Sequence, residues 1–411
     1  MSALNISLLT IGAVVLIVGL FSAQLKRSVL SVPLVALLTG VLLSPAVFGV
    51  LDPAQWGNQE LILEQAARLT LAISLMEIAL RLPKGYPFSN WRSLLVMLGP
   101  VMVLMFLVSG LLAYAILGVS FWAAMLIGAI ITPTDPVVAS SIVQGEVANK
   151  NLPARLRHLL SGESGANDGL AYPFVFLAIL MIQEPSGQAT FQWVTRIILW
   201  EVLGAVVIGA LIGYVAGKAL DWARSRGEIR NPSFLAYSIA LALTALGSTR
   251  LVGTDGILAV FAAGIAFNLA IGSGAEESEK QIDEAVNRFF VLPIFVLLGL
   301  VLPWGEWAAL GWKAPLLAGL VLLLRRPPWV ILLSSRVPSM RGTRDGLFAG
   351  WFGPIGVAAL YYATLSEKVV GLEEAWVVGS LVISTSVLVH GVSAAPLTKL
   401  YGRKAGGDQW N

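Results

Sequence analysis

The chain has 411 residues, of which 57% are hydrophobic and only 12% are charged, and its formal net charge is +3. Together with a mean hydropathy of +0.80, this composition is typical of a protein that crosses a membrane many times. The absence of cysteine excludes disulfides, thiolate metal sites and cysteine nucleophiles. The two distant histidines form no HExxH pattern, which argues against a zinc protease. Nothing in the sequence suggests nucleic-acid binding.

Apolar runs of about 17–25 residues, the length that crosses a bilayer, predict an all-α polytopic membrane protein with about thirteen helices. The expected helices are 4–22, 29–48, 61–82, 94–117, 121–143, 156–182, a long seventh at 191–220, then 234–249, 256–271, 286–302, 312–333, 346–365 and 375–400. The first run has no charged n-region and no convincing cleavage site. We therefore interpret it as a spanning helix and not as a signal peptide.

Basic residues gather in the odd-numbered connections, while the even-numbered ones hold few. The positive-inside rule then predicts a multi-pass protein of the cell (inner) membrane, with the N-terminus outside and the C-terminus in the cytoplasm. From the short tail after residue 400 we expect no soluble regulatory domain. The acidic residues between 276 and 284 are interpreted as a solvated charge run.

Two expected helices are interrupted in the middle. The fifth carries Thr132-Pro-Thr-Asp-Pro136, and the twelfth carries Trp351-Phe-Gly-Pro-Ile-Gly356. With the seventh helix as a linker, these two occupy corresponding positions in two inverted six-helix repeats, and such paired breaks point to a midplane binding site. Proline removes a backbone donor, so we expect both helices to unwind and to cross there. The alternative is a pair of ordinary proline kinks.

The sixth expected helix carries Ser161-Gly-Glu-Ser-Gly-Ala-Asn-Asp-Gly169. A carboxylate at the bilayer centre costs about 2.5–3.5 kcal/mol on insertion scales, so an acid is rarely placed there without a function. Glu163 and Asn167 are four residues apart, as are Ser164 and Asp168, so each pair lies on one helix face. Ser164 and Asp168 are therefore candidates for presenting oxygens to a monovalent cation.

An unwound Thr134-Asp135 would add a hydroxyl, a carboxylate and freed carbonyl groups from the facing helix. The alternative is that these polar side chains only satisfy one another across a helix interface. Three acids beside broken helices favour an ion pathway.

The Thr134-Asp135-Pro136 and Gly162–Asp168 segments together resemble the signature of monovalent cation/proton antiporters, of the bacterial NhaP type with one Asn-Asp pair. The resemblance covers most of the chain. It implies that Asp168 binds cation and proton in turn, with Ser164, Asp135 and Thr134 as further cation ligands. It also implies structural support of the site by Asn167, Glu163 and Arg326, and a looser role for Glu77 in lining the passage.

The arginines at 325 and 326 can also be assessed physically. A guanidinium stays charged, so Arg326 is expected to pair with Glu163 and not to carry protons. Arg325 is expected to extend to the membrane interface, and His158 to lie at the surface. Two positions depart from the family pattern. Ile355 stands where relatives often have arginine, and Gly165 where they often have a large aliphatic residue, which we expect to loosen the packing.

We therefore expect a single membrane transporter domain, 1–411, which is not an enzyme. It would exchange Na⁺ for H⁺, electroneutrally and one for one, with no cofactor and with both ions competing for Asp168. Its core bundle, 90–182 and 312–402, would move against a scaffold, 1–84 and 191–304, and the resemblance implies a homodimer in lipid. K⁺ or Li⁺ could replace Na⁺. Rival functions are an organic-anion symporter of the same architecture and an intramembrane aspartyl protease using Asp135 and Asp168, although its Gly-x-Gly-Asp context is missing.

Overall fold

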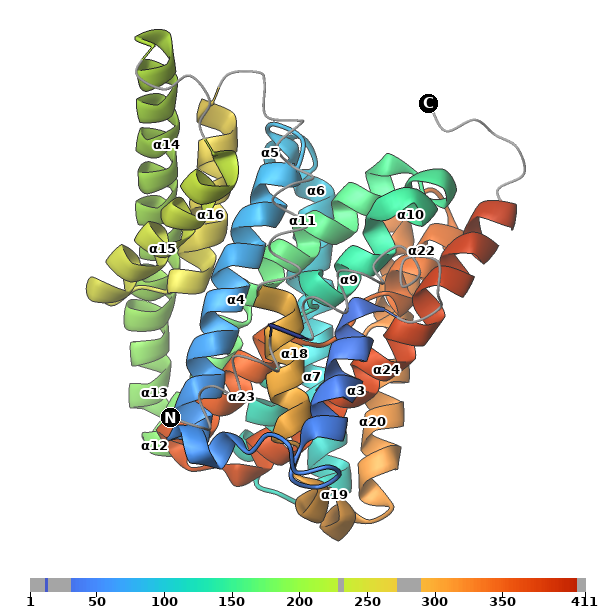
Figure 1. Ribbon diagram of the computed structural model, residues 1–411. Helices are drawn as coiled ribbons and strands as arrows, with labels where there is room; N and C mark the ends of the chain where they lie inside the picture. Colours follow the sequence, from blue (N-terminus) through green and yellow to red (C-terminus); the bar gives the residue numbers. More distant parts are fainter. Residues whose placement is uncertain (1–11, 14–30, 228–232, 272–289, 405–411) are drawn as a thin grey trace.

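The computed structural model describes residues 12–13, 31–227, 233–271 and 290–404, and the regular elements within these ranges are all helical (Figure 1). The expected helix at 4–22 and the acidic run at 276–284 fall almost wholly or wholly outside the described residues, as does the start of the helix expected at 286–302. Six continuous described helices are long and apolar enough to cross a membrane, and a bent pair, Leu292–Leu300 with Trp304–Leu310, makes up to seven.

The helices of the first half match the expected segments closely. A 3₁₀ turn (η1) and two π-helical stretches (η2, η3) accompany them. Their bounds are α3 Val32–Leu43, η1 Pro53–Trp56, α4 Gln59–Arg81, α5 Tyr86–Ser89, α6 Trp91–Val96, η2 Met97–Val101, α7 Met102–Leu117, α8 Phe121–Ile130, α9 Pro136–Val143, α10 Gly145–Asn151, α11 Ala154–Leu170, α12 Tyr172–Gln183, α13 Ser186–Gln192, η3 Trp193–Val202 and α14 Leu203–Ser225.

The second half has the same character, with a helix break near the middle of two expected segments, 312–333 and 346–365. Its elements are α15 Phe234–Leu251, α16 Gly256–Ala270, α18 Leu292–Leu300, α19 Trp304–Leu310, α20 Lys313–Leu324, α21 Pro327–Leu333, η5 Ser334–Arg336, α22 Thr343–Trp351, α23 Val357–Val370 and α24 Glu373–Lys404.

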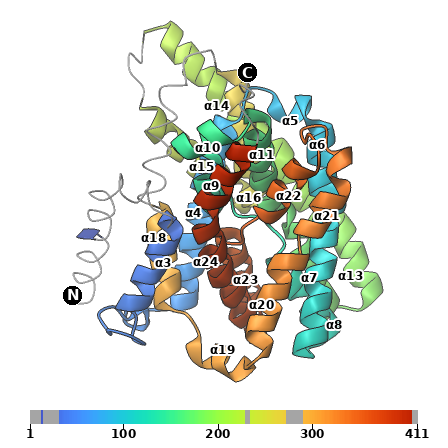
Figure 2. The ribbon, with the colours of Figure 1, turned by 90° about the vertical axis from the view of Figure 1, so that its right-hand side faces the viewer.

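The connections form two opposite faces. We call the end with residues 82–90, 144–153 and 337–342 the odd-loop face, and the end with residues 118–120, 184–185 and 371–372 the even-loop face; they lie toward the top and bottom of Figure 1. Helices α14, α15 and α16 stand on one side of the molecule and α20, α22 and α24 on the other. Figure 2 shows α20 beside α7 on that second side, where the two helices pack together.

Small residues let α14 pack directly on α16. A Cβ atom on Gly209 would meet Ala259, and one on Gly213 would meet Ala263, in each case at the backbone. Close backbone approach at small residues is a typical packing mode of membrane helices, where burial of apolar surface gives no driving force between helices. The close contact of α14 with α16 builds a rigid helix pair at the edge of the molecule.

Candidate functional site

The two interrupted helices cross at their unwound segments. One break separates α8 from α9, and the other separates α22 from α23. The backbone N–H of Asp135 donates to the carbonyl of Pro354 at 2.7 Å, and the N–H of Val357 donates to Asp135 Oδ2. The predicted crossing of unwound helices is therefore confirmed.

Asp135 acts here as a cap shared by two helices. Its Oδ1 accepts from the N–H groups of Val137 at 2.6 Å and Val138 at 3.2 Å, at the start of α9, while its Oδ2 accepts from Val357, at the start of α23. An anion at two helix N-termini compensates their positive ends. Both oxygens of the expected cation ligand are thus already engaged in this structure. The same engagement leaves Asp135 unsuited to share a proton with Asp168 in a protease dyad.

Arg325 compensates the opposite helix ends, and the expectation that it reaches the membrane interface was wrong. The residue is only 2% exposed. Its guanidinium donates to the carbonyls of Ile131, Thr132 and Pro133 at 2.8, 2.9 and 3.3 Å, after the end of α8, and to that of Gly353, after the end of α22. These carbonyls have lost their helical partners, so a buried cation is favourable here. The break between α20 and α21 thus supplies a basic group to both unwound segments.

Glu163 and Arg326 form a bidentate ion pair in the interior. Arg326 Nη1 lies 2.7 Å from Glu163 Oε1, and Nη2 lies 2.9 Å from Oε2, with both side chains 2% exposed. Arg326 Nε also donates to the carbonyl of Ala349 at 3.0 Å. The pair links α11 to the break before α21 and to α22, so it braces the core around the crossing.

Asn167 holds the unwound segment of the fifth helix against α11. Its Nδ2 donates to Glu163 Oε1 at 2.9 Å and to Thr134 Oγ1 at 2.7 Å, while its Oδ1 accepts from the Thr134 N–H at 3.1 Å. The hydroxyls of Thr134 and Ser164 lie 3.0 Å apart. Four residues expected in the site are thus joined in one hydrogen-bonded network.

Asp168 differs from the other acids of the site. It is 0% exposed, and neither carboxylate oxygen has a hydrogen-bond partner among the described residues. Its backbone carbonyl accepts from the hydroxyl of Tyr362 at 2.7 Å, which fixes this part of α11 against α23. A buried carboxylate without a partner is costly, so the site is built for a ligand that neutralises it.

The packing beside Asp168 is tight, contrary to the expectation for Gly165. A Cβ atom at position 165 would lie 2.5 Å from the ring of Phe261, and one at Gly169 would lie 2.6 Å from the Cβ of Leu258. The ring of Phe261 on α16 therefore takes the space that a large side chain at 165 would need. Gly165 is required by this close approach and does not loosen it.

The structure also places Glu77 and His158, whose expected positions were less closely defined by the sequence. Glu77 is 8% exposed on α4, where it forms an ion pair with Arg81 at 2.6 Å. His158, expected at the surface, is only partly exposed and packs edge-on against the ring of Tyr86 at 5.8 Å.

His390 and Ser386 support the second unwound segment and were not anticipated from the sequence. Ser386 Oγ accepts from the N–H of Ile355 at 2.7 Å and lies 3.0 Å from His390 Nδ1. His390 Nε2 lies 3.0 Å from the carbonyl of Trp351. A serine and a histidine four residues apart in an apolar helix were the available signal, since that spacing places both on one face.

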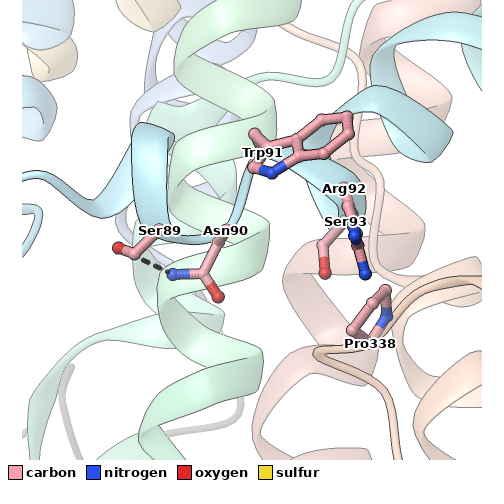
Figure 3. Close-up of a pocket in the computed structure, with 6 residues that line it drawn as sticks. All are labelled: Ser89, Asn90, Trp91, Arg92, Ser93 and Pro338. Carbon is pink, nitrogen blue, oxygen red and sulfur yellow. Dashed lines mark hydrogen bonds between the residues drawn. The ribbon is translucent and has the colours of Figure 1, made fainter.

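A hollow of about 320 Å³ lies elsewhere, at the odd-loop face (Figure 3). It is lined by Ser89, Asn90, Trp91, Arg92, Ser93 and Pro338. Because these residues include no acid, the hollow lacks the carboxylate that binds a bare cation. Among the described residues no group of three or more His, Cys, Asp or Glu could hold a metal ion.

An unpartnered membrane carboxylate beside two crossed, unwound helices is the arrangement typical of broken-helix ion transporters. The transmembrane sodium/hydrogen exchanger family matches residues 12–400, so the chain belongs to that family and is a multi-pass membrane protein.

Individual proteins agree with this assignment. A probable Na⁺/H⁺ antiporter of Schizosaccharomyces pombe is 36% identical over 386 residues, which are 87% of this chain and 51% of the relative. The K⁺/H⁺ antiporter NhaP of Alkalimonas amylolytica is 24% identical over 97% of this chain and 67% of its own. The structure of the sodium proton antiporter MjNhaP1 from Methanocaldococcus jannaschii at pH 8 has the same fold, with a TM-score of 0.77 at 17% identity, covering 99% of this chain and 100% of that one. The chain spans about half the length of the S. pombe relative.

Proposed function

We propose that this protein exchanges a monovalent cation, Na⁺ in the first instance, for H⁺ across the cell membrane. The observation that carries the proposal is the buried carboxylate of Asp168, whose two oxygens have no partner among the described residues. Ser164 and Thr134 supply hydroxyl oxygens to the same network. Small hard cations prefer such oxygen ligands.

The charges around the crossing support a one-for-one exchange. Glu163 forms an ion pair with Arg326, while Asp135 and Arg325 carry opposite charges at opposite helix ends of the crossing. Asp168 then carries the only uncompensated charge in this set of five. Either one proton or one monovalent cation neutralises it, and the buried carboxylate with neither ligand would carry a desolvation cost. The full cycle therefore moves no net charge.

The remaining parts of the proposal concern assembly and placement. We propose that the core, 90–182 and 312–402, moves against the scaffold, 1–84 and 191–304, and that two copies associate through the scaffold. Exposed apolar side chains on α14, among them Leu203, Val207, Leu211 and Val215, support this interface. The odd-loop face, where basic residues gather, would be cytoplasmic.

The test is exchange by protein reconstituted in liposomes, read with a pH-sensitive dye after adding Na⁺, K⁺ or Li⁺. We expect Na⁺ to move protons, Asp168→Asn to abolish the signal while the protein stays folded, and Glu306→Gln, an exposed glutamate on α19, to leave it unchanged. If K⁺ alone gave a signal, the protein would select K⁺, as the name of the A. amylolytica relative indicates for that protein. Robust exchange by Asp168→Asn would refute the proposal, and uptake of an organic anion would favour the symporter.

A further inference from the structure

Polar side-chain contacts between the proposed core and scaffold gather toward the even-loop face. In the part of the chain that the structure describes, Tyr172 of α12 donates to Glu201 of η3, and Trp193 Nε1 of η3 donates to the carbonyl of Pro173 at 2.7 Å. Lys368, near the end of α23, pairs with Glu64 of α4 at 2.9 Å. In Figure 1 the even-loop ends of α4 and α23 lie close together, whereas Tyr172 and Pro173 begin α12 at its other end, next to α11.

Glu201 is anchored within the scaffold and offers one oxygen to the core. The residue is 5% exposed. Its Oε1 binds Arg196 Nε at 2.8 Å, and its backbone carbonyl accepts from the N–H of Asp255, at the start of α16, at 2.9 Å. Its Oε2 is left for the hydroxyl of Tyr172. Losing that hydroxyl would leave Glu201 paired, so the contact can break without creating an isolated charge.

Helix α23 connects these contacts to the ion site. Tyr361 is buried on α23, the core helix that packs against α4 of the scaffold. The next residue, Tyr362, donates its hydroxyl to the carbonyl of Asp168. A row of polar groups therefore extends from Asp168 toward the even-loop face, between the core and the scaffold.

We propose that the Tyr172–Glu201 hydrogen bond, one helical turn beyond Asp168, and the Lys368–Glu64 ion pair, near the even-loop face, form a latch between core and scaffold on the even-loop side of the ion site. The latch holds that face closed in this conformation and must open for Asp168 to exchange its ligand there. The proposal builds on the transport function but concerns its gate. A hydrogen bond to a charged group that exists in only one of two states biases their populations, and removing it shifts the balance by about tenfold.

The chain has no cysteine, so an introduced thiol is the only one in the protein. Ser366 of α23 is 0% exposed, its hydroxyl has no partner among the described residues, and it precedes Lys368 by two positions. Ser366→Cys is nearly isosteric and places a buried reporter beside the latch. The experiment measures its labelling by a polar maleimide in detergent, with no ion flux involved.

We expect Tyr172→Phe in this background to raise the labelling rate about tenfold. The matched control is Tyr237→Phe, because the Tyr237 hydroxyl donates to the carbonyl of Ala216 at 2.9 Å within the scaffold. It should label at the parent rate. Glu64→Gln should also accelerate labelling, and Glu60→Gln, an exposed glutamate one turn away on the same helix, should not.

Labelling at the parent rate in both Tyr172→Phe and Glu64→Gln would overturn the latch. An equal rise in Tyr172→Phe and Tyr237→Phe would also overturn it, because it would report general loosening. The latch and the transport function can fail separately: a labelling change with no cation exchange by the parent would retain the latch and reject the antiport.

Discussion

Replacing Glu163 by glutamine should destabilise the protein strongly, because it removes the counter-charge of Arg326. The guanidinium lies in the interior, with two of its nitrogens 2.7 and 2.9 Å from the carboxylate oxygens. Glutamine keeps the volume and one acceptor oxygen, but it leaves a positive charge buried without an anion. Breaking a buried pair by removing one partner typically costs about 3–5 kcal/mol.

A loss of that size lowers the folding equilibrium constant by about two to three and a half orders of magnitude. Asn167 adds to the expected cost, since it donates to the same carboxylate at 2.9 Å. The double variant Glu163→Gln with Arg326→Gln should be milder than either single one, because it leaves no isolated charge and the two amides can bond to each other. Arg226→Gln, an exposed arginine over the ring of Trp222, is the matched control.

The assay is thermal unfolding in detergent, followed by tryptophan fluorescence and by the loss of monodisperse protein. We expect a clearly lowered melting temperature for Glu163→Gln, partial recovery in the double variant, and a parent-like value for the control. Single and double variants that all melt like the parent would show that the ion pair contributes nothing. A double variant less stable than both single ones would contradict the reasoning on isolated charge.

Three further outcomes are expected. Arg325→Met should destabilise the crossing by roughly 1–3 kcal/mol for each carbonyl left without a donor, measured by the same melting assay; a parent-like melting temperature would contradict its role between the helix ends. Gly165→Leu should impair folding and exchange because of the clash with Phe261, and Phe261→Ala should restore both; the absence of rescue would show that another contact limits position 165. Exchange in liposomes should not respond to a membrane potential clamped with valinomycin, because one proton replaces one cation at Asp168; a rate that follows the potential would mean a second proton carrier, with Glu77 the first to test.

The helical fold and the crossing could be predicted because their signals are local. Apolar length determines where helices span the membrane, and Pro133, Pro136 and Pro354 mark the breaks directly. The i,i+4 spacing of Glu163 with Asn167 placed both on one face, and the structure shows them in hydrogen-bond contact. Only one step required the whole chain: recognising that the breaks of the fifth and twelfth expected helices occupy corresponding positions in two inverted repeats.

The functions of Arg325 and Gly165 could not be read from the sequence, since each depends on a distant backbone. An arginine at the end of an apolar run extends to the interface unless unpaired carbonyls lie nearby, and here those carbonyls come from residues 131–133 and 353. The glycine at position 165 suggested loose packing, but the ring of Phe261 lies directly against it. The difference between Asp135 and Asp168 has the same origin, because the N–H groups that Asp135 binds include Val357 from the other repeat.

The most direct test of the central claim, that cation and proton compete for Asp168, is proton release by the purified protein. Na⁺ is added to protein in weakly buffered detergent solution, and a pH dye records the protons that leave, since a cation displaces the proton from a shared ligand. The account predicts release of about one proton per chain at saturating Na⁺, weaker apparent Na⁺ affinity as the pH falls, and no release from Asp168→Asn. Equal release from Asp168→Asn, or Na⁺ binding that does not depend on pH, would contradict it.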